Sequence, residues 1–284
     1  MKKCFKFLIS LIFCLNLSIS ANNRILTQNN HAIPVVINQD RLEKIKEKGV
    51  LTVLSPNIEP YSYKNPNSGD FTGLDADIIT EVAKRLGINE VQVKYVNFPY
   101  IVESLLNNPE ADMIAKAIYI TKDRKNILNF TNPIYTEGET ILTRNDTKIF
   151  SKTDLKNKTV GTFSNTVFLD LASDWKKQNL LKDYIAFHDN TSLILSLKNK
   201  LVDAIITDSM QANNLILKES NSNFKVLSPN QYKTELTMDV SYPFKKEDIT
   251  LVNAFNEKLQ EMKSDGTLYN ILTQYGLTSH YINN

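Results

Sequence analysis

The chain has 284 residues, of which 42% are hydrophobic and 23% are charged, enough for one large domain or two of ordinary size. A formal net charge of +2 is too small to indicate binding to nucleic acid or to an anionic membrane. Both cysteines, Cys4 and Cys14, lie near the N-terminus. If that segment is removed, disulfides, thiolate catalysis and thiolate-bound metals are excluded.

The first predicted element, residues 1–20, has the pattern of a secretory signal peptide. A basic start, "MKK", precedes an apolar run, and small residues follow at Ser18 and Ser20. An uncleaved anchor would need about 20 apolar residues, and Asn16 interrupts this shorter run. A lipoprotein is disfavoured because Phe13, not a small residue, precedes Cys14. We therefore expect a cleaved signal and a soluble periplasmic protein, with 30 basic residues left of 33 against 31 acidic ones.

Residues 21–40 mix Asn, Gln and a proline without period, and are predicted to be a loose leader. From Arg41 onward, hydrophobic periodicity alternates between strands and helices. The elements expected in chain order are strand 49–55, helix 74–87, strand 91–96, helix 99–107, strands 111–120, 139–144 and 158–163, helix 166–177, strand 184–187, helix 191–199, strand 202–207, and helices 209–218, 247–266 and 267–276. This alternation of strands and helices predicts right-handed βαβ units with a mostly parallel sheet, and so an α/β fold.

Two stretches in this pattern are candidates for crossings between lobes. Residues 132–146 contain Pro133 and Gly138, and residues 230–244 form a second irregular segment. A chain that leaves one lobe, builds another and returns would have its first lobe at 41–137, its second lobe at 138–237 and its return at 238–284. Periodicity alone also admits one continuous sheet.

Two predicted strands end in charged residues. One leads through "IYITKDR" to Arg124, and the other, "DAIIT", leads to Asp208. Ligands of open α/β sheets bind beyond the carboxyl ends of the strands. A guanidinium matches a carboxylate with two hydrogen bonds and an aspartate accepts from an ammonium, so the pair suits a zwitterion. The simpler readings, a surface arginine and a helix N-cap aspartate, stay open.

Six motifs in order resemble the periplasmic solute-binding proteins of amino-acid ABC transporters, the bacterial extracellular solute-binding protein family 3. They are "GVLTVLS…EPYSY", "FTGLDADIITEVAKRLG", "ADMIAKAIYITKDRKNILNFTNPIYTEG", "LKNKTVGTFSNT", "VDAIITD" and "LQEMKSDGTLYNILTQYG", together covering residues 48–276. The resemblance implies the type II fold of periplasmic binding proteins. In that fold two α/β lobes are joined by two hinge strands, with the ligand cleft between the lobes.

The resemblance also implies roles for individual residues. Arg124 would hold the α-carboxylate of a bound amino acid, and Asp208 its α-amino group. Tyr61 lies in the family's aromatic stretch after the first strand, and Phe98 where an aromatic side chain often lines the pocket. Thr166 begins a second-lobe helix whose free amide groups suit an anion.

Other positions depart from the family pattern. Ala117 and Tyr119 stand where glycine or serine and a small hydroxyl residue are common, so Tyr119 would reshape the pocket while keeping a hydrogen-bond donor. Lys116 could meet an acidic ligand group if it faces inward. Ser55 replaces the aspartate of relatives that bind basic amino acids, although Glu59 lies nearby.

The sequence thus predicts a monomeric receptor for an amino acid or a related small carboxylate, which passes its ligand to a membrane permease. We expect no cofactor, no nucleic-acid partner and no metal, because His31, His188 and His280 are scattered without ligand spacing. We also expect no enzymatic activity.

The alternative is an enzyme resembling the cyclohexadienyl (arogenate/prephenate) dehydratases, which share this scaffold and are similar to residues 187–211. Their reaction needs a general acid. They carry a glutamate where this chain has Gln211 and a lysine where it has Glu139, which leaves Asp208 as a possible substitute acid.

Overall fold

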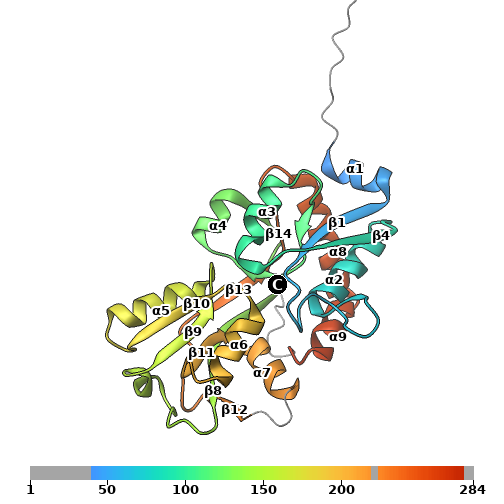
Figure 1. The fold of residues 1–284 in the computed structure, drawn as a ribbon. Coiled ribbons are helices and arrows are strands. Elements are labelled where there is room, and N and C mark those ends of the chain that lie inside the picture. The colour runs from blue at the N-terminus through green and yellow to red at the C-terminus, as the bar shows by residue number, and fades with distance from the viewer. Residues whose placement is uncertain (1–39, 219–222, 278–284) are drawn as a thin grey trace, which may run out of the picture. The chain divides into compact units, whose positions relative to one another are not determined.

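The computed structural model describes residues 40–218 and 223–277. The predicted signal peptide and the leader up to residue 39 lie outside these residues. The described chain forms two α/β lobes joined by the extended strands β8 (Tyr135–Arg144) and β13 (Thr237–Ser241) (Figure 1). The predicted fold class is therefore confirmed. None of the described helices is both long and apolar enough to cross a membrane.

The first lobe is built on a sheet with the strand order β4-β1-β5-β14-β7. Its strands are β1 (Val50–Ser55), β4 (Glu90–Tyr95), β5 (Met113–Ile114), β7 (Leu128–Phe130) and β14 (Pro243–Lys245). Its other elements are α1 (Arg41–Lys48), the hairpin β2 (Tyr63–Lys64) and β3 (Phe71–Thr72), α2 (Leu74–Arg85), the 3-10 helix η1 (Phe98–Tyr100), α3 (Ile101–Asn107), α4 (Lys122–Ile127), α8 (Ile249–Ser264) and α9 (Thr267–Gln274). Because α8 and α9 pack against α2, the end of the described chain returns to this lobe.

The second sheet has the strand order β10-β9-β11-β8-β13-β6, with β12 also paired to β8, so it runs from the second lobe through the two crossing strands to β6. Its remaining strands are β6 (Ile118–Tyr119), β9 (Thr159–Phe163), β10 (Asp183–Phe187), β11 (Ala204–Asp208) and β12 (Phe224–Val226). The helices of the second lobe are η2 (Lys152–Leu155), α5 (Val167–Lys177), α6 (Asn190–Lys198) and α7 (Ser209–Lys218). Strands β10 and β11 flank β9, so right-handed crossovers place α5 and α6 on opposite faces of the sheet (Figure 1).

The prediction of one strand over residues 111–120 is wrong. Strand β5 belongs to the first sheet, where Met113 pairs with Phe244, whereas β6 belongs to the second sheet, where Tyr119 pairs with Val240. The chain therefore passes from one sheet to the other within this apolar run. Periodicity could not show the break because both halves are buried.

The prediction of a mostly parallel sheet also needs correction, because both sheets are mixed. Strand β1 pairs in parallel with β4 and β5, and β9 pairs in parallel with β10 and β11, as the βαβ rhythm predicts. Strands β8, β12, β13 and β14 pair with their neighbours in antiparallel. Parallel neighbours need a long crossover connection, which the stretches that cross between the lobes do not have.

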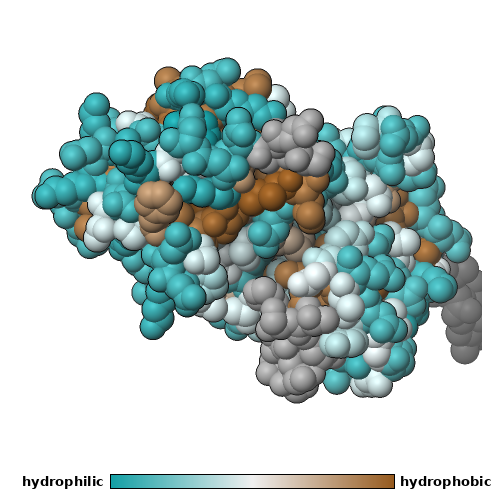
Figure 2. Space-filling view, turned by 90° about the horizontal axis from the view of Figure 1, so that it is seen from below, coloured by the Kyte–Doolittle hydropathy of each residue, from teal (hydrophilic) through white to brown (hydrophobic). Residues whose placement is uncertain are grey.

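Buried apolar side chains from both lobes form one large cluster, and a smaller cluster includes Leu54, Ile101 and Leu105 beneath α3. Figure 2 shows one face of the molecule, which is largely hydrophilic except for a band of hydrophobic side chains across its middle. The core thus continues from lobe to lobe and does not end at the crossing strands.

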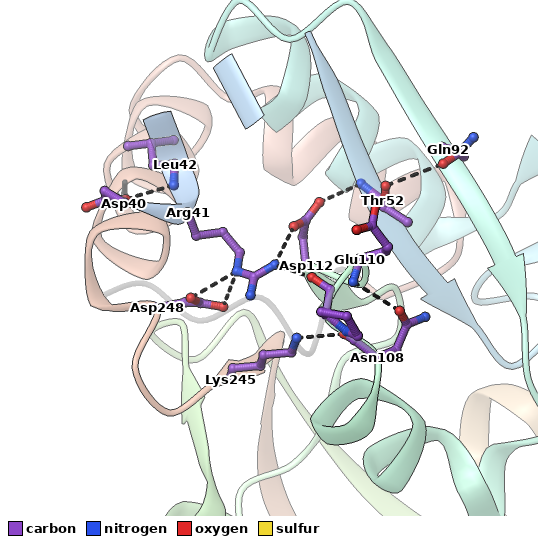
Figure 3. A network of polar contacts seen from close by, with 11 residues as sticks. Asp40, Arg41, Leu42, Thr52, Gln92, Asn108, Glu110, Asp112, Lys245 and Asp248 are labelled. Carbon is purple, nitrogen blue, oxygen red and sulfur yellow. Dashed lines mark hydrogen bonds and ion pairs between the residues drawn. The ribbon is translucent and has the colours of Figure 1, made fainter. Parts of the chain in front are cut away.

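A partly buried ion-pair network holds α1, at the start of the described chain, to the loop before α8 and to the first sheet (Figure 3). The guanidinium of Arg41, on α1, donates to Asp248 at 3.0 Å and to Asp112 at 3.2 Å. Asp112 also accepts from the amide of Thr52 at 2.7 Å, and Lys245 donates to the carbonyl of Asn108 at 2.7 Å. We call Arg41, Asp112 and Asp248 the Arg41 cluster.

Candidate functional site

A small cavity of about 40 Å³ is lined by residues of both lobes. A cavity that binds benzene in an engineered protein measures about 150 Å³, so the described cavity admits water but is too small for an amino acid. Of the predicted site residues, those that line it are Phe98, Ala117, Tyr119, Arg124, Thr166 and Asp208. Lys116 also lines it and so faces inward, and the remaining lining residues are Ile58, Ile118, Glu137, Phe163, Val167, Phe168 and Gln211. We call this cavity the pocket.

Tyr61 does not line the cavity itself but contacts its wall. The tyrosine is fully buried, and its hydroxyl is hydrogen bonded to Glu137 and Asp208. The start of α2 fixes its backbone, because the amide of Asp75 donates to the Tyr61 carbonyl at 2.8 Å. Gly73 permits this approach, since a Cβ at that position would lie 2.7 Å from the carbonyl oxygen of Pro60.

Arg124 lies in the first turn of α4, which Thr121 caps by accepting from the Arg124 amide at 3.2 Å. The guanidinium donates to the carbonyls of Tyr119 at 2.9 Å and Asn165 at 3.2 Å, and so bridges the lobes. Burial lowers the pKa of Arg124, with Asp170 and Tyr119 opposing that effect. Within residues 40–218 and 223–277, no carboxylate forms an ion pair with Arg124. A ligand carboxylate matches this guanidinium.

On the second lobe, the pocket wall includes the start of a helix. Thr166 is the N-cap of α5 and accepts from the amide of Leu169 at 3.3 Å. The preceding Asn165 donates its side-chain amide to the carbonyl of Pro99, on the first lobe, at 2.7 Å. The start of α5 therefore meets the first lobe at the rim of the pocket.

The acidic wall of the pocket consists of Asp208 and Glu137, which are 5% and 2% exposed. Asp208 ends β11 and accepts from the amide of Gln211 at 2.7 Å, so it caps α7, as the simpler reading of its sequence position suggested. Glu137 comes from β8. Burial and the charge of Asp208 raise the pKa of Glu137 well above its ordinary value, although Lys116 and Tyr61 act against this.

Lys116 is 8% exposed and lines the pocket. Its ammonium lies 3.1 Å from the centroid of the Tyr61 ring, a cation–π contact. Asp75, on α2, is fully buried nearby and accepts from the hydroxyl of Tyr242 at 3.0 Å. Burial raises the pKa of Asp75 to about 6, and the charge of Lys116 is the largest opposing effect. The inward position of Lys116 therefore serves two buried acids of the protein, Asp75 and Glu137.

Aromatic side chains from both lobes close the apolar side of the pocket. Phe98 packs edge-on against Phe163 with ring centroids 6.4 Å apart, and Tyr119 packs edge-on against Phe168 at 5.6 Å. The Tyr119 hydroxyl is buried without a hydrogen-bond partner among the described residues. An unsatisfied buried donor in a pocket is costly, and a ligand oxygen would satisfy it.

Other residues that the sequence singled out lie away from the pocket. Glu59 forms an ion pair with Lys218, and Ser55 donates to the carbonyl of Ser62 at 2.9 Å. Glu139 accepts from the hydroxyl of Tyr232 and from backbone amides of the chain that leads into β13. In the described parts of the chain, no His, Cys, Asp and Glu side chains gather as three or more potential metal ligands.

The sequence analysis missed Glu137, Phe163 and Phe168 as lining residues. Phe163 and Phe168 flank Thr166, the helix start that was predicted for the site. Glu137 carried only a weak signal, because it is one of two glutamates, with Glu139, in the predicted crossing at residues 132–146. A charged residue in such a buried strand indicates a pocket or a partner.

A two-lobed α/β fold whose pocket is lined by residues of both lobes is typical of solute-binding proteins. The family model of the bacterial extracellular solute-binding proteins, family 3, matches residues 50–278. The chain therefore belongs to this family, and the resemblance seen in the sequence is confirmed.

Curated relatives are similar over most of the chain. The "probable histidine-binding protein" of Campylobacter jejuni is 29% identical over 78% of this chain and 83% of its own length. The L-cystine-binding protein TcyA of Bacillus subtilis is 29% identical over 82% of this chain and 83% of its own length. The relatives are thus named as binding proteins for amino acids.

Solved structures share the fold. Holo ArgBP from T. maritima aligns with a TM-score of 0.68 at 28% identity, over 78% of this chain and 93% of that one. An ancestral amino acid-binding protein described as a precursor of cyclohexadienyl dehydratase aligns with a TM-score of 0.71 at 27% identity, over 84% and 99% of the two chains.

Proposed function

We propose that this protein is a periplasmic receptor that binds an amino acid or a related small carboxylate and delivers it to an ABC transporter permease. The observation that carries the proposal is the charge arrangement of the pocket. Arg124 presents a guanidinium without a carboxylate partner among the described residues, and Asp208 and Glu137 present buried carboxyl groups. A zwitterion supplies one charge for each side. The named amino-acid-binding relatives support this choice.

The mechanism that we propose is hinge closure, with lobe boundaries at 41–137, 138–237 and 238–284. The pocket in the described state is too small for an amino acid, so a ligand enters only when the lobes separate. A ligand that contacts both lobes stabilises the closed state more than the open one, and this difference shifts the population. Arg124 on the first lobe and Asp208 on the second would be the two anchors.

Binding is tested by a thermal-shift screen of the purified protein, refolded to remove any carried ligand, against the twenty amino acids and small dicarboxylates. A ligand present at 100 times its dissociation constant adds about 2.7 kcal/mol to the stability. The Arg124→Lys variant is the matched control, because it keeps the charge but loses the planar fork. No shift with any amino acid or carboxylate would contradict the proposal.

Part of the proposal concerns location and assembly. We propose a signal peptide at residues 1–20, a mature monomer in the periplasm and no cofactor. The family's description as extracellular supports this location. Mass spectrometry of the N-terminus of the exported protein tests the cleavage, and light scattering tests the monomer.

A dehydratase-like activity is the second candidate, because one structural neighbour is described as a precursor of such an enzyme. Gln211 cannot act as an acid, since its side chain is an amide that donates to Asn190 at 2.7 Å. Glu137, with its raised pKa, is the group in the pocket that could donate a proton. Incubation with prephenate and arogenate separates the candidates: a receptor leaves both compounds unchanged, and an enzyme consumes one.

A further inference from the structure

Three oxygen atoms at the pocket wall make two hydrogen bonds that share one hydroxyl group. The Tyr61 hydroxyl is 2.6 Å from Glu137 Oε1 and is also hydrogen bonded to Asp208 Oδ1. A phenol hydroxyl has a single proton, so it donates to only one of the two carboxyl groups. In the other hydrogen bond the carboxyl group must carry the proton and donate it to the Tyr61 oxygen. The geometry therefore requires one extra proton in this trio.

The surroundings indicate which carboxyl group holds that proton. Asp208 Oδ1 also accepts from the amide of Gln211 at 2.7 Å, so this oxygen already acts as a hydrogen-bond acceptor. Glu137 has only the Tyr61 hydroxyl as a side-chain hydrogen-bond partner within the described residues. The titratable or charged groups that face Glu137 come from α2, the segment before β6, β6 itself, β8, β11 and the turn before β2: Asp75, Lys116, Tyr119, Tyr135, Asp208 and Tyr61. Glu137 is thus the protonated member of the trio.

Lys116 does not take the place of this proton. Its ammonium lies over the face of the Tyr61 ring, and no hydrogen bond or ion pair joins it to a carboxyl group in the part of the chain that the structure describes. Its charge reduces the cost of burying two acids, but it does not donate to the trio. Among the described residues, no cationic side chain therefore donates to Glu137 or Asp208.

We propose that Glu137 is a ligand-binding residue, and that the ammonium group of the ligand replaces the proton that Glu137 and Asp208 share through Tyr61. On binding, the Glu137 proton leaves to solvent and the ligand ammonium donates to both carboxylates, so the net charge of the site is unchanged. The pocket then selects ligands with an ammonium group over carboxylates of the same shape that lack one. This inference rests on the proposed amino-acid receptor and names the part of the ligand that the acidic wall recognises.

The shared proton is tested without a ligand, by ¹³C NMR of the glutamate carboxyl groups as a function of pH. The Glu137 signal, assigned by its loss in Glu137→Gln, should titrate at a pH well above that of an ordinary exposed glutamate. Glu257 is the matched control, because it is exposed on α8 and the neighbouring Lys258 lowers its pKa. If the Glu137 carboxyl group ionises in the pH range of an ordinary exposed glutamate, the proposal is overturned, whatever the ligand is.

The exchange for ammonium is tested by titration calorimetry in phosphate and Tris buffers, with the L-amino acid that gives the largest thermal shift as the probe. We expect release of about one proton per ligand and an affinity that rises about tenfold per pH unit near neutrality. In Glu137→Gln, whose amide imitates the protonated acid, proton release should vanish and the pH profile should become flat.

The outcomes separate the two proposals. Tight binding without proton release in the unchanged protein overturns the proton exchange and leaves the receptor in place. A protonated Glu137 by NMR with no binding of any amino acid overturns the receptor, and with it the ammonium as the replacing group. The 2-hydroxy acid that matches the probe should bind at least tenfold more weakly, and equal affinity would contradict the selection.

Discussion

Two clusters of buried charge have similar composition and opposite pairing. In the Arg41 cluster, the guanidinium binds two carboxylates of its own chain, Asp112 and Asp248. In the pocket, the guanidinium of Arg124 donates to two backbone carbonyls, while the nearby acids Glu137 and Asp208 bind a tyrosine hydroxyl. The first arrangement satisfies its charges internally. In the second, no ion pair within the described residues joins Arg124, Glu137 or Asp208 to a group of opposite charge.

The pKa shifts of the two arginines follow this difference. Burial lowers the pKa of both side chains. At Arg41, the charges and hydrogen bonds of Asp248 and Asp112 more than offset burial and raise the pKa overall, whereas at Arg124 the pKa remains lowered. A buried charge paired within the chain supports the fold, and one kept unpaired costs stability that a ligand can recover.

The largest expected effect is on binding. Replacing Arg124 with alanine removes two charge-assisted hydrogen bonds to the ligand carboxylate, each worth about 1.5–3 kcal/mol. We expect at least a hundredfold loss of affinity by calorimetry and little change in the unfolding temperature. The affinity of Arg124→Lys should lie between that of Arg124→Ala and that of the unchanged protein. Wild-type affinity in Arg124→Ala would remove this residue from the site.

Arg41→Ala should have the opposite effect to Arg124→Ala: it should reduce the stability of the protein and leave its ligand affinity unchanged. Two buried carboxylates lose their partner, at a cost of about 3 kcal/mol in urea unfolding. The double variant Arg41→Ala, Asp248→Asn removes one of the uncompensated charges and should recover part of this loss. If the double variant is less stable than the single one, charge pairing does not explain the network.

The pH dependence of stability tests Asp75, a further buried acid, which faces Lys116. Because burial raises the pKa of Asp75 to about 6, the folded state binds more protons than the unfolded chain between about pH 4 and 6. Stability should therefore fall as the pH rises through this window, by about 3 kcal/mol from this group. Asp75→Asn should remove that decline in unfolding curves.

A matched control for Asp75 is Asp265, whose pKa is lowered to about 2 by Thr267 and Arg85. Its contribution has the opposite sign, because stability is lost as the pH falls from about 4 to 2. Asp265→Asn should therefore leave the decline between pH 4 and 6 intact. An unchanged profile in Asp75→Asn would contradict the assignment.

The smallest effect concerns the helix start at the pocket. Thr166→Val removes the hydroxyl that caps α5, at a cost of about 1 kcal/mol in stability. Thr166→Ser keeps the oxygen and should retain the stability of the unchanged protein. A loss in Thr166→Ser as large as in Thr166→Val would show that the methyl group matters more than the cap.

Hydrophobic periodicity predicted helices well where apolar residues recur at helical spacing. The helical face of Leu74, Ile78, Ile79 and Val82 is buried as its spacing indicates. The pattern was less useful at the crossings, since residues 111–120 read as one strand although its halves join different sheets. The short helix α4 was also missed, because a helix of this length has too few positions to show a period.

Most of the candidate site could be found from motifs, and its acidic wall only in part. Arg124, Asp208 and Thr166 follow strands or begin helices, so their places could be predicted from order along the chain. Glu137 could not, because its meeting with Tyr61 depends on how far β8 runs past β11 and on the turn that α2 fixes. Such contacts are set by tertiary register, which one sequence does not show.

Strand β14 has a consequence for how the protein is made. It lies between β5 and β7 in the first sheet, although it comes more than 110 residues after β7 in the chain. During synthesis, the first lobe therefore cannot complete its sheet until residues 243–245 have been added, whereas the strands β8 to β11 of the second lobe are already present. The lobe that is begun first is finished last, and its sheet keeps an open edge while the second lobe is synthesised.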